Sequence, residues 1–566
     1  MNSWFGLLVR HFIGRFFDND ILAQSTDMRT NMVQAIGLAA SPGMLFAFYM
    51  LPQDVRYNQP FAGRWGMVTD CYFFVLYSML VMGLVMVLEW DALFPDRRDY
   101  TILTPLPLRA HAIFWGKAAA LVGLVAIFLL AGNCFGMLLA PIVTSGPGAS
   151  LATFAGIVWA HSVAVVAAGA FAALAFAGIQ GILINVLTGR AFRRISPWVQ
   201  MAAMALVITV LFLTPLICDV MRPAILTRQP VTRWFPPFWF LGLYLDLLPG
   251  HPAGPLFHEL AGYAPRGLWA ATAIFAATYL AGYGRHARRV MESLETAGEG
   301  PGMLRRIFER LVNRWVLPHP LERATFHFIS NTILRNARQR LFLALYAGVA
   351  LALALPQVLR AGERHGVPVL TFLAAGMTAV PLTLTFFAVT GLRAAFNFPA
   401  ELRANWIFQV AEIGESARHL RAVRKWVVVM ALAPLALLLA PWEIYVRGWW
   451  QALIQMSFAI VLALLMIALL LVWFRKIPFT CSYFPGKTAM AATALIYLVA
   501  YISFIWTMTR LEERLVGAPT DLALFYLCGA LSLAGLALLE KRELGIDSVL
   551  IYEDQPEPVV RSLELG

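Results

Sequence analysis

Charged residues are scarce in this 566-residue chain, and their scarcity decides its class. Asp, Glu, Lys and Arg make up only 13% of the residues, whereas hydrophobic residues make up 60%. A soluble globular domain carries about 25% charged residues, so a soluble fold is excluded. The mean hydropathy of +0.69 agrees. The composition predicts an all-α polytopic membrane protein, since helices satisfy their own backbone groups in lipid.

Cysteine is equally sparse and is not clustered. No two of the five cysteines stand in a CxxC pair. Disulfide frameworks and zinc sites both need clustered spacings, so neither is expected. We interpret these residues as small apolar side chains. They are Cys71, Cys134, Cys218, Cys481 and Cys528.

Motifs that would support catalysis are missing. There is no HExxH or GxSxG stretch and no cluster of His, Asp and Glu at metal-ligand spacing. Gly486, Lys487 and Thr488 resemble the end of a phosphate-binding loop, but Cys481 stands where the leading glycine belongs. The sequence therefore predicts that this chain is not an enzyme and holds no metal and no cofactor of its own.

Ionisable residues are also rare within the apolar runs. Glu89, Asp91 and Glu443 lie near the ends of such runs, and His161 lies within a run that has no acidic residue. Proton- and sodium-coupled carriers usually keep acidic or histidine relays inside the membrane. The pattern therefore disfavours a self-contained ion-coupled transporter. We interpret His161 as a polar residue satisfied inside the bundle, with a proton carrier as the minor alternative.

Long apolar runs, in contrast, are abundant, and about twelve approach the roughly 20 residues that cross a bilayer. Most of the 44 Lys and Arg fall on the side of the N-terminus, so the positive-inside rule places both termini in the cytoplasm of the plasma membrane, taken here as a bacterial inner membrane. The net charge of +12 then indicates membrane lipids as partners and not nucleic acid. The runs are about 32–51, 67–90, 113–141, 151–187, 197–219, 267–284, 341–359, 367–391, 426–441, 450–474, 488–508 and 521–539.

Three further stretches are amphipathic or aromatic and too short to span. Residues 4–17 place Leu8 and Phe12 on one helical side, and residues 318–340 are amphipathic before the seventh run. Both predict helices lying in the membrane interface. Residues 233–249 are rich in aromatics and proline. They predict a helix that lies at the outer interface or dips into it.

The order of these elements is the same in both parts of the chain. An amphipathic stretch, two apolar runs, a polar Phe-Pro segment and four more runs occur twice, which predicts a duplication. Because each half has an even number of runs, the halves would be parallel six-helix repeats about an axis along the membrane normal. One chain would then need no second copy. The predicted organisation is a first half at 1–290, a cytoplasmic linker at 291–317, a second half at 318–544 and a cytoplasmic tail at 545–566.

The two Phe-Pro segments, at 94–117 and 398–425, are the candidates for binding a partner protein. The first begins with a charge cluster and is broken by prolines, and the second ends in a basic helical face. A charged surface helix with apolar side chains suits a protein partner, whereas an ordinary basic loop is the alternative. The candidate docking residues are Arg97, Arg98, Leu106, Pro107, Leu108, Arg109 and Lys117 in the first segment and Arg418, Arg421 and Arg424 in the second.

The first segment also carries a family-like motif. Leu106-Pro107-Leu108-Arg109 is followed by Gly116-Lys117, between the second and third of six runs. This resembles the permease subunit of type-2 ABC exporters, whose coupling helix has a Leu-Pro-x-(Ser/Leu)-Arg…Gly-Lys motif. The resemblance implies two six-span halves fused in one chain and a separate ATPase subunit that binds ATP. The second segment lacks the Leu-Pro-x-x-Arg part.

The function implied by this resemblance is ATP-driven export. Dimerisation of the ATPase would pull the two segments together and rock the halves. The apolar spans, rich in Phe and Met, suit a lipidic or amphipathic cargo. Two alternatives stay open: a self-contained, ion-coupled secondary transporter, and a membrane scaffold of unknown role.

Overall fold

Helices form almost all of the described part of the chain. The computed structural model describes residues 4–17, 37, 40–41, 43–44, 62–90, 110–145, 150–250, 254–292, 303–364, 367–400, 405–411, 416–481, 490–545 and 550. Within these residues, nine helices are long and apolar enough to cross a membrane. This confirms a multi-pass, all-α membrane protein.

Nine, and not twelve, is the number of spans that the described residues support. The run predicted at 32–51 lies largely outside them. The runs predicted at 267–284 and 488–508 form helices α12 (Pro255–Glu292) and α21 (Met490–Val516), which are not among the nine.

The chain divides into two compact units. Unit 1 comprises Met1–Glu299 and Ala361–Thr371, and unit 2 comprises Gly300–Arg360 and Phe372–Gly566. Each unit has hydrophobic core clusters of its own.

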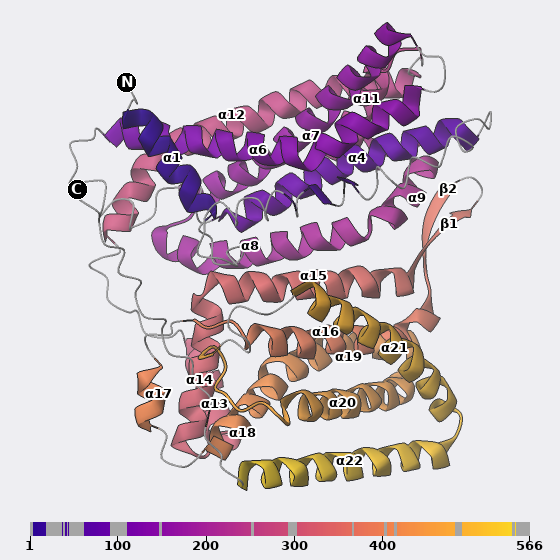
Figure 1. The fold of residues 1–566 in the computed structure, drawn as a ribbon. Coiled ribbons are helices and arrows are strands. Elements are labelled where there is room, and N and C mark those ends of the chain that lie inside the picture. Colours follow the sequence, from indigo (N-terminus) through magenta and orange to yellow (C-terminus); the bar gives the residue numbers. More distant parts are fainter. Residues whose placement is uncertain are drawn as a thin grey trace. The chain divides into compact units, whose positions relative to one another are not determined.

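Unit 1 is a helical bundle built around α7 (Leu151–Val186). Figure 1 shows α1 (Trp4–Phe17) beside α6 (Ala110–Ser145). α7 packs against α4 (Ala62–Leu88), α6, α11 (Pro236–Leu247) and α12. The other helices of this unit are α8 (Gly189–Phe212), α9 (Thr214–Leu226) and α10 (Val231–Trp234).

Small residues explain why α7 has so many neighbours. Ala164 and Ala168 are fully buried one turn apart, and small side chains let membrane helices approach closely. Gly169 lies at a tight crossing, where a Cβ would stand 2.4 Å from Leu129 and 2.6 Å from Ser78. The alanine- and glycine-rich sequence of α7 therefore places this helix at the centre of unit 1.

Helix α11 is packed inside the protein. Phe240, Leu241 and Tyr244 are almost completely buried, whereas Trp234, just before α11, is 82% exposed. Proline at the first positions of α11 suits a helix start, because its fixed φ is already helical. Residues 236–247 therefore form a helix inside the bundle of unit 1, and the predicted position of this stretch at the outer interface stays a prediction.

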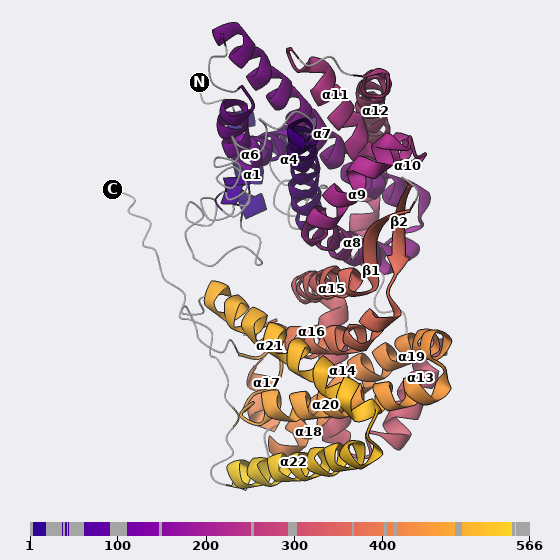
Figure 2. The same ribbon diagram turned by 90° about the vertical axis from the view of Figure 1, so that its right-hand side faces the viewer.

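Unit 2 is a second bundle, built around α20 (Trp449–Leu471). α20 packs against α16 (Ala379–Ala395), α19 (Ala433–Arg447), α21 and α22 (Pro519–Gly545). α14 (Pro320–Arg335) packs against α15 (Ala337–Val358) and α18 (Ser416–Val427). Figure 2 shows α22 at the edge of this unit, as does Figure 1. The shorter elements are α13 (Met303–Trp315), the 3₁₀-helix η3 (Ala374–Thr378), α17 (Trp406–Ala411) and the π-helix η5 (Val428–Leu432).

A short hairpin is the one β element of the described residues. β1 (Leu359–Arg364) and β2 (Val367–Phe372) pair as a two-stranded sheet between α15 and η3. The sequence does not predict this hairpin: β2 occupies the beginning of the run predicted at 367–391, and the helix long enough to span begins only at Gly376. Gly376 lets η3 pack on the end of α15, since a Cβ there would be 1.7 Å from the carbonyl oxygen of Gln357.

Both predicted amphipathic helices form, and their apolar sides face protein. α1 buries Leu8, Phe12 and Phe16 in a core cluster shared with α6, and α14 buries Phe326 and Ile329 in one shared with α18. These side chains are covered by neighbouring helices, which supply an apolar surface for them. The predicted position of both helices in the membrane interface stays a prediction.

Candidate functional site

Most of the first predicted docking segment lies outside the described residues. The predicted docking residues outside the described part of the chain are Arg97, Arg98, Leu106, Pro107, Leu108 and Arg109. Gly116 and Lys117, at its end, belong to the first turns of α6. The docking role of the whole segment stays a prediction.

Lys117 is buried against the N-terminal helix. The residue is only 3% exposed, and its Nζ lies 4.8 Å from the ring centroid of Phe12 and 4.7 Å from that of Phe16. Aromatic faces attract a cation, more strongly where water is excluded. Gly116 lets α1 approach, because a Cβ there would be 2.7 Å from a methyl carbon of Leu8. The Gly-Lys pair therefore attaches α1 to the start of α6.

In the second segment, helix α18 packs against α14. Leu420 and Trp426 of α18 are buried in the shared core. His419 Nδ1 lies 2.7 Å from the hydroxyl of Thr325, and Trp426 Nε1 donates a hydrogen bond to Ser330 Oγ at 2.8 Å. One side of α18 is therefore committed to contacts within the protein.

The predicted docking arginines of α18 differ in exposure. Arg424 forms an ion pair with Glu540 of α22, Arg418 is half-buried, and Arg421 is exposed. Of these three, Arg421 is the side chain most available to a partner.

Lys425 links the end of α18 to α14. Its Nζ lies 2.6 Å from Glu322 Oε2 and donates to the carbonyl oxygen of Val316 at 2.8 Å. Glu322 is 3% exposed. Loss of Lys425 would leave the buried Glu322 carboxylate without its cation, which is strongly unfavourable. This contact therefore fixes α18 on α14.

The beginning of the second segment is bonded to the loop after α20. The Phe479 N–H donates to the Phe396 carbonyl at 3.2 Å, and the Ala400 N–H donates to the Phe479 carbonyl at 3.0 Å. Phe479 has φ +69°, an uncommon conformation for a bulky residue. The two backbone bonds and its 1% exposure hold it there. The Phe-Pro turn and this loop therefore form one packed structure.

Backbone carbonyls at the end of α4 and just after it accept hydrogen bonds from side chains of neighbouring helices. Gln180 donates to the Trp90 carbonyl, and Gln200 donates to the Val87 carbonyl at 3.0 Å. Trp90 Nε1 donates to Ser196 Oγ at 3.0 Å. The last carbonyls of a helix have no partner within that helix, so these amides explain how α4 ends inside the protein.

His161 is buried inside the bundle, as predicted, but only one of its two ring nitrogens has a hydrogen-bond partner among the described residues. The residue is fully buried, and its Nδ1 lies 2.7 Å from the hydroxyl of Tyr244 on α11. Its ring meets that of Phe74 edge to face. The histidine therefore ties α7 to α11.

Helices α18, η5 and α19 follow one another without a break. A buried cluster of charged residues lies at the end of α19, far from Lys425. Glu443 is 0% exposed, and its Oε2 lies 3.6 Å from Arg447 Nε. Glu512 of α21 is 1% exposed and interacts electrostatically with both. At 1.5 Å per residue, Glu443 lies about 27 Å beyond Lys425. We call Glu443, Arg447 and Glu512 the acidic cluster.

The prediction from sequence omits Glu512, although a signal for it exists. Ile505, Met508 and Leu515 of α21 pack in the core, and Glu512 stands among them at helical spacing. An acid on the apolar face of a membrane helix indicates a functional residue.

A neutral hydrogen-bonded group lies in the same unit. The Nε2 of Gln357 is 3.2 Å from both Thr383 Oγ1 and Tyr501 Oη, which are 3.1 Å apart. These residues join α15, α16 and α21. The hydroxyl of Tyr501 therefore ties α21 to α15 and α16.

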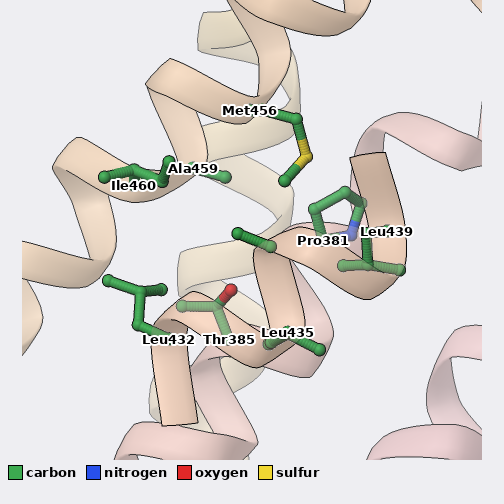
Figure 3. Close-up of a pocket in the computed structure, with 9 residues that line it drawn as sticks. Pro381, Thr385, Leu432, Leu435, Leu439, Met456, Ala459 and Ile460 are labelled. Carbon is green, nitrogen blue, oxygen red and sulfur yellow. The ribbon is translucent and has the colours of Figure 1, made fainter. Parts of the chain in front are cut away.

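Unit 2 also contains a small apolar cavity, shown in Figure 3. Its volume is about 10 Å³, about enough for one water molecule, so it is too small for a cargo molecule. Leu439, in its wall, lies one turn before Glu443 on α19. The lining residues are Pro381, Thr385, Leu432, Leu435, Ala436, Leu439, Met456, Ala459 and Ile460.

Comparison with protein-family models, curated proteins and solved structures gives no match to this chain. Among the residues described, no group of three or more His, Cys, Asp or Glu is arranged to bind a metal ion. The resemblance to type-2 ABC permeases therefore depends on the short motif and on the order of the helices.

Proposed function

We propose that this chain is the permease of an ATP-driven exporter, energised by a separate ATPase subunit that binds its two cytoplasmic Phe-Pro segments. The observation that supports this most is a repeated attachment. In both halves, an amphipathic helix is held against the start of the third predicted span, next to the segment that would bind the ATPase.

The helices of the two units also share a packing scheme. In unit 1, the fourth predicted span, α7, packs against the second, third and sixth, which are α4, α6 and α12. In unit 2, the fourth, α20, packs against α16, α19 and α22, which are again the second, third and sixth. The same order and the same partners support a duplicated six-span unit. Such a chain would supply both halves of a permease that otherwise needs two copies.

A lysine makes the attachment in each half. Lys117 lies over Phe12 and Phe16 of α1, and Lys425 is paired with Glu322 of α14. The chemistry differs between the halves, since one contact is a cation–π interaction and the other an ion pair. The positions correspond, because Lys117 lies near the beginning of the third run (113–141) and Lys425 directly precedes the third run of the second half (426–441). Each lysine holds the helix that precedes the first run of its half.

This arrangement suggests how a motion of the ATPase would reach the membrane helices. An ATPase bound to residues 94–109 and to the Arg421 side of α18 would pull on α6 and α19, which continue those segments. The lysine contacts would make α1 and α14 move with them. Rocking of the halves would then open a path outward, or into the outer leaflet, for a lipidic or amphipathic cargo.

Copurification with an ATPase tests this proposal. The tagged full-length chain is purified from its native host, with and without the combined charge reversals Arg97→Glu, Arg98→Glu and Arg109→Glu. We expect an ATPase to copurify with the unmodified chain and to be lost from the variant. Mass spectrometry identifies the partner, and ATP hydrolysis in the eluate measures it.

The matched control is Arg266→Glu, an exposed arginine near the start of α12. It should insert into the membrane and retain the ATPase. Association that survives all three reversals in the first segment would show that the docking assignment is wrong.

The buried acidic cluster favours a second candidate, an ion-coupled secondary transporter. Acids inside membrane helices commonly form ion pathways, and Glu443 and Glu512 are both buried. Transport in ATP-free vesicles that follows an imposed proton gradient would support this candidate and contradict the first.

A further inference from the structure

We propose that Glu443, Arg447 and Glu512 form a binding site for one exchangeable proton inside unit 2. The proposal does not depend on the ATPase, because it concerns the opposite end of the helical run that begins with α18. It rests on the geometry, burial and charge of three side chains from α19 and α21.

All three groups are withdrawn from the surface. Glu443 and Glu512 are 0% and 1% exposed, and the Arg447 side chain is 18% exposed. No side-chain oxygen of either glutamate accepts a hydrogen bond from the described residues. Buried polar atoms are normally hydrogen-bonded, and each exception needs an explanation. A bound proton would explain how two buried carboxyl groups are tolerated without hydrogen-bond donors.

The charges of the cluster balance only if one proton is present. Arg447 carries one positive charge at any physiological pH, whereas two ionised glutamates carry two negative charges. A buried net charge is costly, and neutralisation by a proton is the usual remedy. One carboxylic acid, one carboxylate and one guanidinium together are neutral.

The proton belongs on Glu512. Glu443 has Arg447 Nε 3.6 Å away on the next turn of its own helix. The charged groups that act on Glu512 are Arg447, Glu443 and the neighbouring Glu513, so two of the three are acids. Glu443 is therefore the better candidate for the ionised partner of Arg447.

The surrounding elements supply neutral groups at this end of unit 2. Arg447 Nη2 lies 3.2 Å from Thr378 Oγ1 and 3.3 Å from the Ala374 carbonyl, both of η3. On α20, Gln455 donates to the Met377 carbonyl at 2.9 Å, and its own Oε1 accepts no hydrogen bond from the described residues. Asp521, at the start of α22, is exposed. The contacts with η3 orient Arg447. None of these groups neutralises the charge of a second ionised glutamate.

The site would couple proton exchange to a movement of α21 against α19. With the proton bound, the cluster is neutral and Glu512 stays near Glu443 and Arg447. Loss of the proton would leave one net negative charge, which favours access of water and separation of Glu512 from Glu443. The exchange would take place at the turns that join α19 to α20 and α21 to α22.

Infrared difference spectroscopy on the full-length chain in lipid nanodiscs tests the site. A protonated carboxyl group gives a C=O stretching band that shifts in D₂O. We expect the spectrum of the unmodified chain at neutral pH to lose such a band, equivalent to one acid, in Glu512→Gln. Glu513→Gln, at the exposed neighbouring position, should retain it. Glu512→Asp should retain a band at a shifted frequency.

A second variant keeps the proposal testable if Glu512→Gln does not fold. Glu443→Gln leaves Glu512 beside Arg447 as the only acid of the cluster, so the band should also disappear. If neither variant changes the band, the site holds no proton. A band that falls as sodium chloride replaces choline chloride at constant pH would identify a site for a monovalent cation and overturn the proton assignment. ATPase copurification of Glu512→Gln should be normal, which separates this proposal from the proposed function.

Discussion

At the scale of single residues, several basic side chains near the Phe-Pro segments bind the protein's own helices. Lys117 is covered by two aromatic rings, Arg424 is paired with Glu540, and Lys425 with Glu322. Positive charge beside apolar runs influences topology, but these three residues also hold helices together. A basic residue in such a segment is therefore not by itself a sign of a docking surface.

Lys117→Met should weaken the attachment of α1 to α6. The substitution keeps an apolar stem but removes the cation from the faces of Phe12 and Phe16. A desolvated cation–π contact contributes about 1–2 kcal/mol. The measurement is a double-mutant cycle with Phe12→Leu, read from thermal unfolding in nanodiscs. Strict additivity of the two changes would mean that the ring contact contributes nothing.

Arg424→Glu should destabilise unit 2, whereas Arg421→Glu should not. The first change puts a carboxylate beside the largely buried Glu540 and should cost about 3 kcal/mol. The second alters an exposed side chain and should stay within about 0.5 kcal/mol. Thermal unfolding of both variants measures the difference. The reciprocal change Glu540→Arg should restore the Arg424→Glu variant, and a failure to do so would show that the ion pair is not the cause.

Residue roles were predictable where they depend on local pattern and not where they depend on distant partners. His161 is recognisable as a buried polar residue from the apolar run around it. The pairing of Glu512 with Glu443 and Arg447 is not visible in sequence, because the residues lie on different helices that meet only after folding. The same holds for Lys117, whose neighbours Phe12 and Phe16 are about a hundred positions away.

At the scale of helices, close approach in unit 1 depends on positions without a side chain. Gly169→Ala should destabilise the crossing of α7 with α4 and α6, since the new Cβ would lie 2.4 Å from Leu129 and 2.6 Å from Ser78. Overpacking of this kind costs about 1–3 kcal/mol. Thermal unfolding of the purified chain measures the effect.

Gly262→Ala on α12 is the matched control. Nothing lies within 4 Å of a Cβ at that position, and alanine is the better helix former by about 0.5–1 kcal/mol. This variant should be as stable as the unmodified chain or slightly more stable. Equal losses in both variants would contradict the packing explanation.

The long apolar helices were predictable because lipid permits few alternatives to a helix. Helix α11 was harder to place, since an aromatic, proline-rich stretch suits either an interface or a packed interior. The β1–β2 hairpin was missed because β2 is apolar and continuous with the run predicted at 367–391, and its pairing with β1 is not visible in sequence. The contact of Phe479 with the Phe-Pro turn was also missed, because it depends on a left-handed backbone conformation at a residue that rarely adopts one.

At the scale of the whole molecule, the predicted duplication makes a definite statement about sidedness. If both halves have six spans and the same orientation, the segment 293–302 and both termini share one side of the membrane, and the loop between β1 and β2 lies on the other. Fusions of green fluorescent protein and alkaline phosphatase at these positions report the side. We expect fluorescence at residue 298 and at the C-terminus, and phosphatase activity between β1 and β2. Phosphatase activity at residue 298 would rule out six spans in the first half.

The π-helix between α18 and α19 has a consequence for the rotational phase of this long run. Each residue turns an α-helix by about 100°, and a π-bulge behaves as one residue inserted into it. The bulge at Val428–Leu432 therefore sets the angle between Lys425, which must face α14, and Glu443, which must face α21. Deleting one residue of the bulge would restore a regular helix and turn one of these side chains away from its partner. The five residues of the π-helix thus set the rotation of the continuous helix so that Lys425 meets Glu322 and Glu443 lies on the side of Glu512.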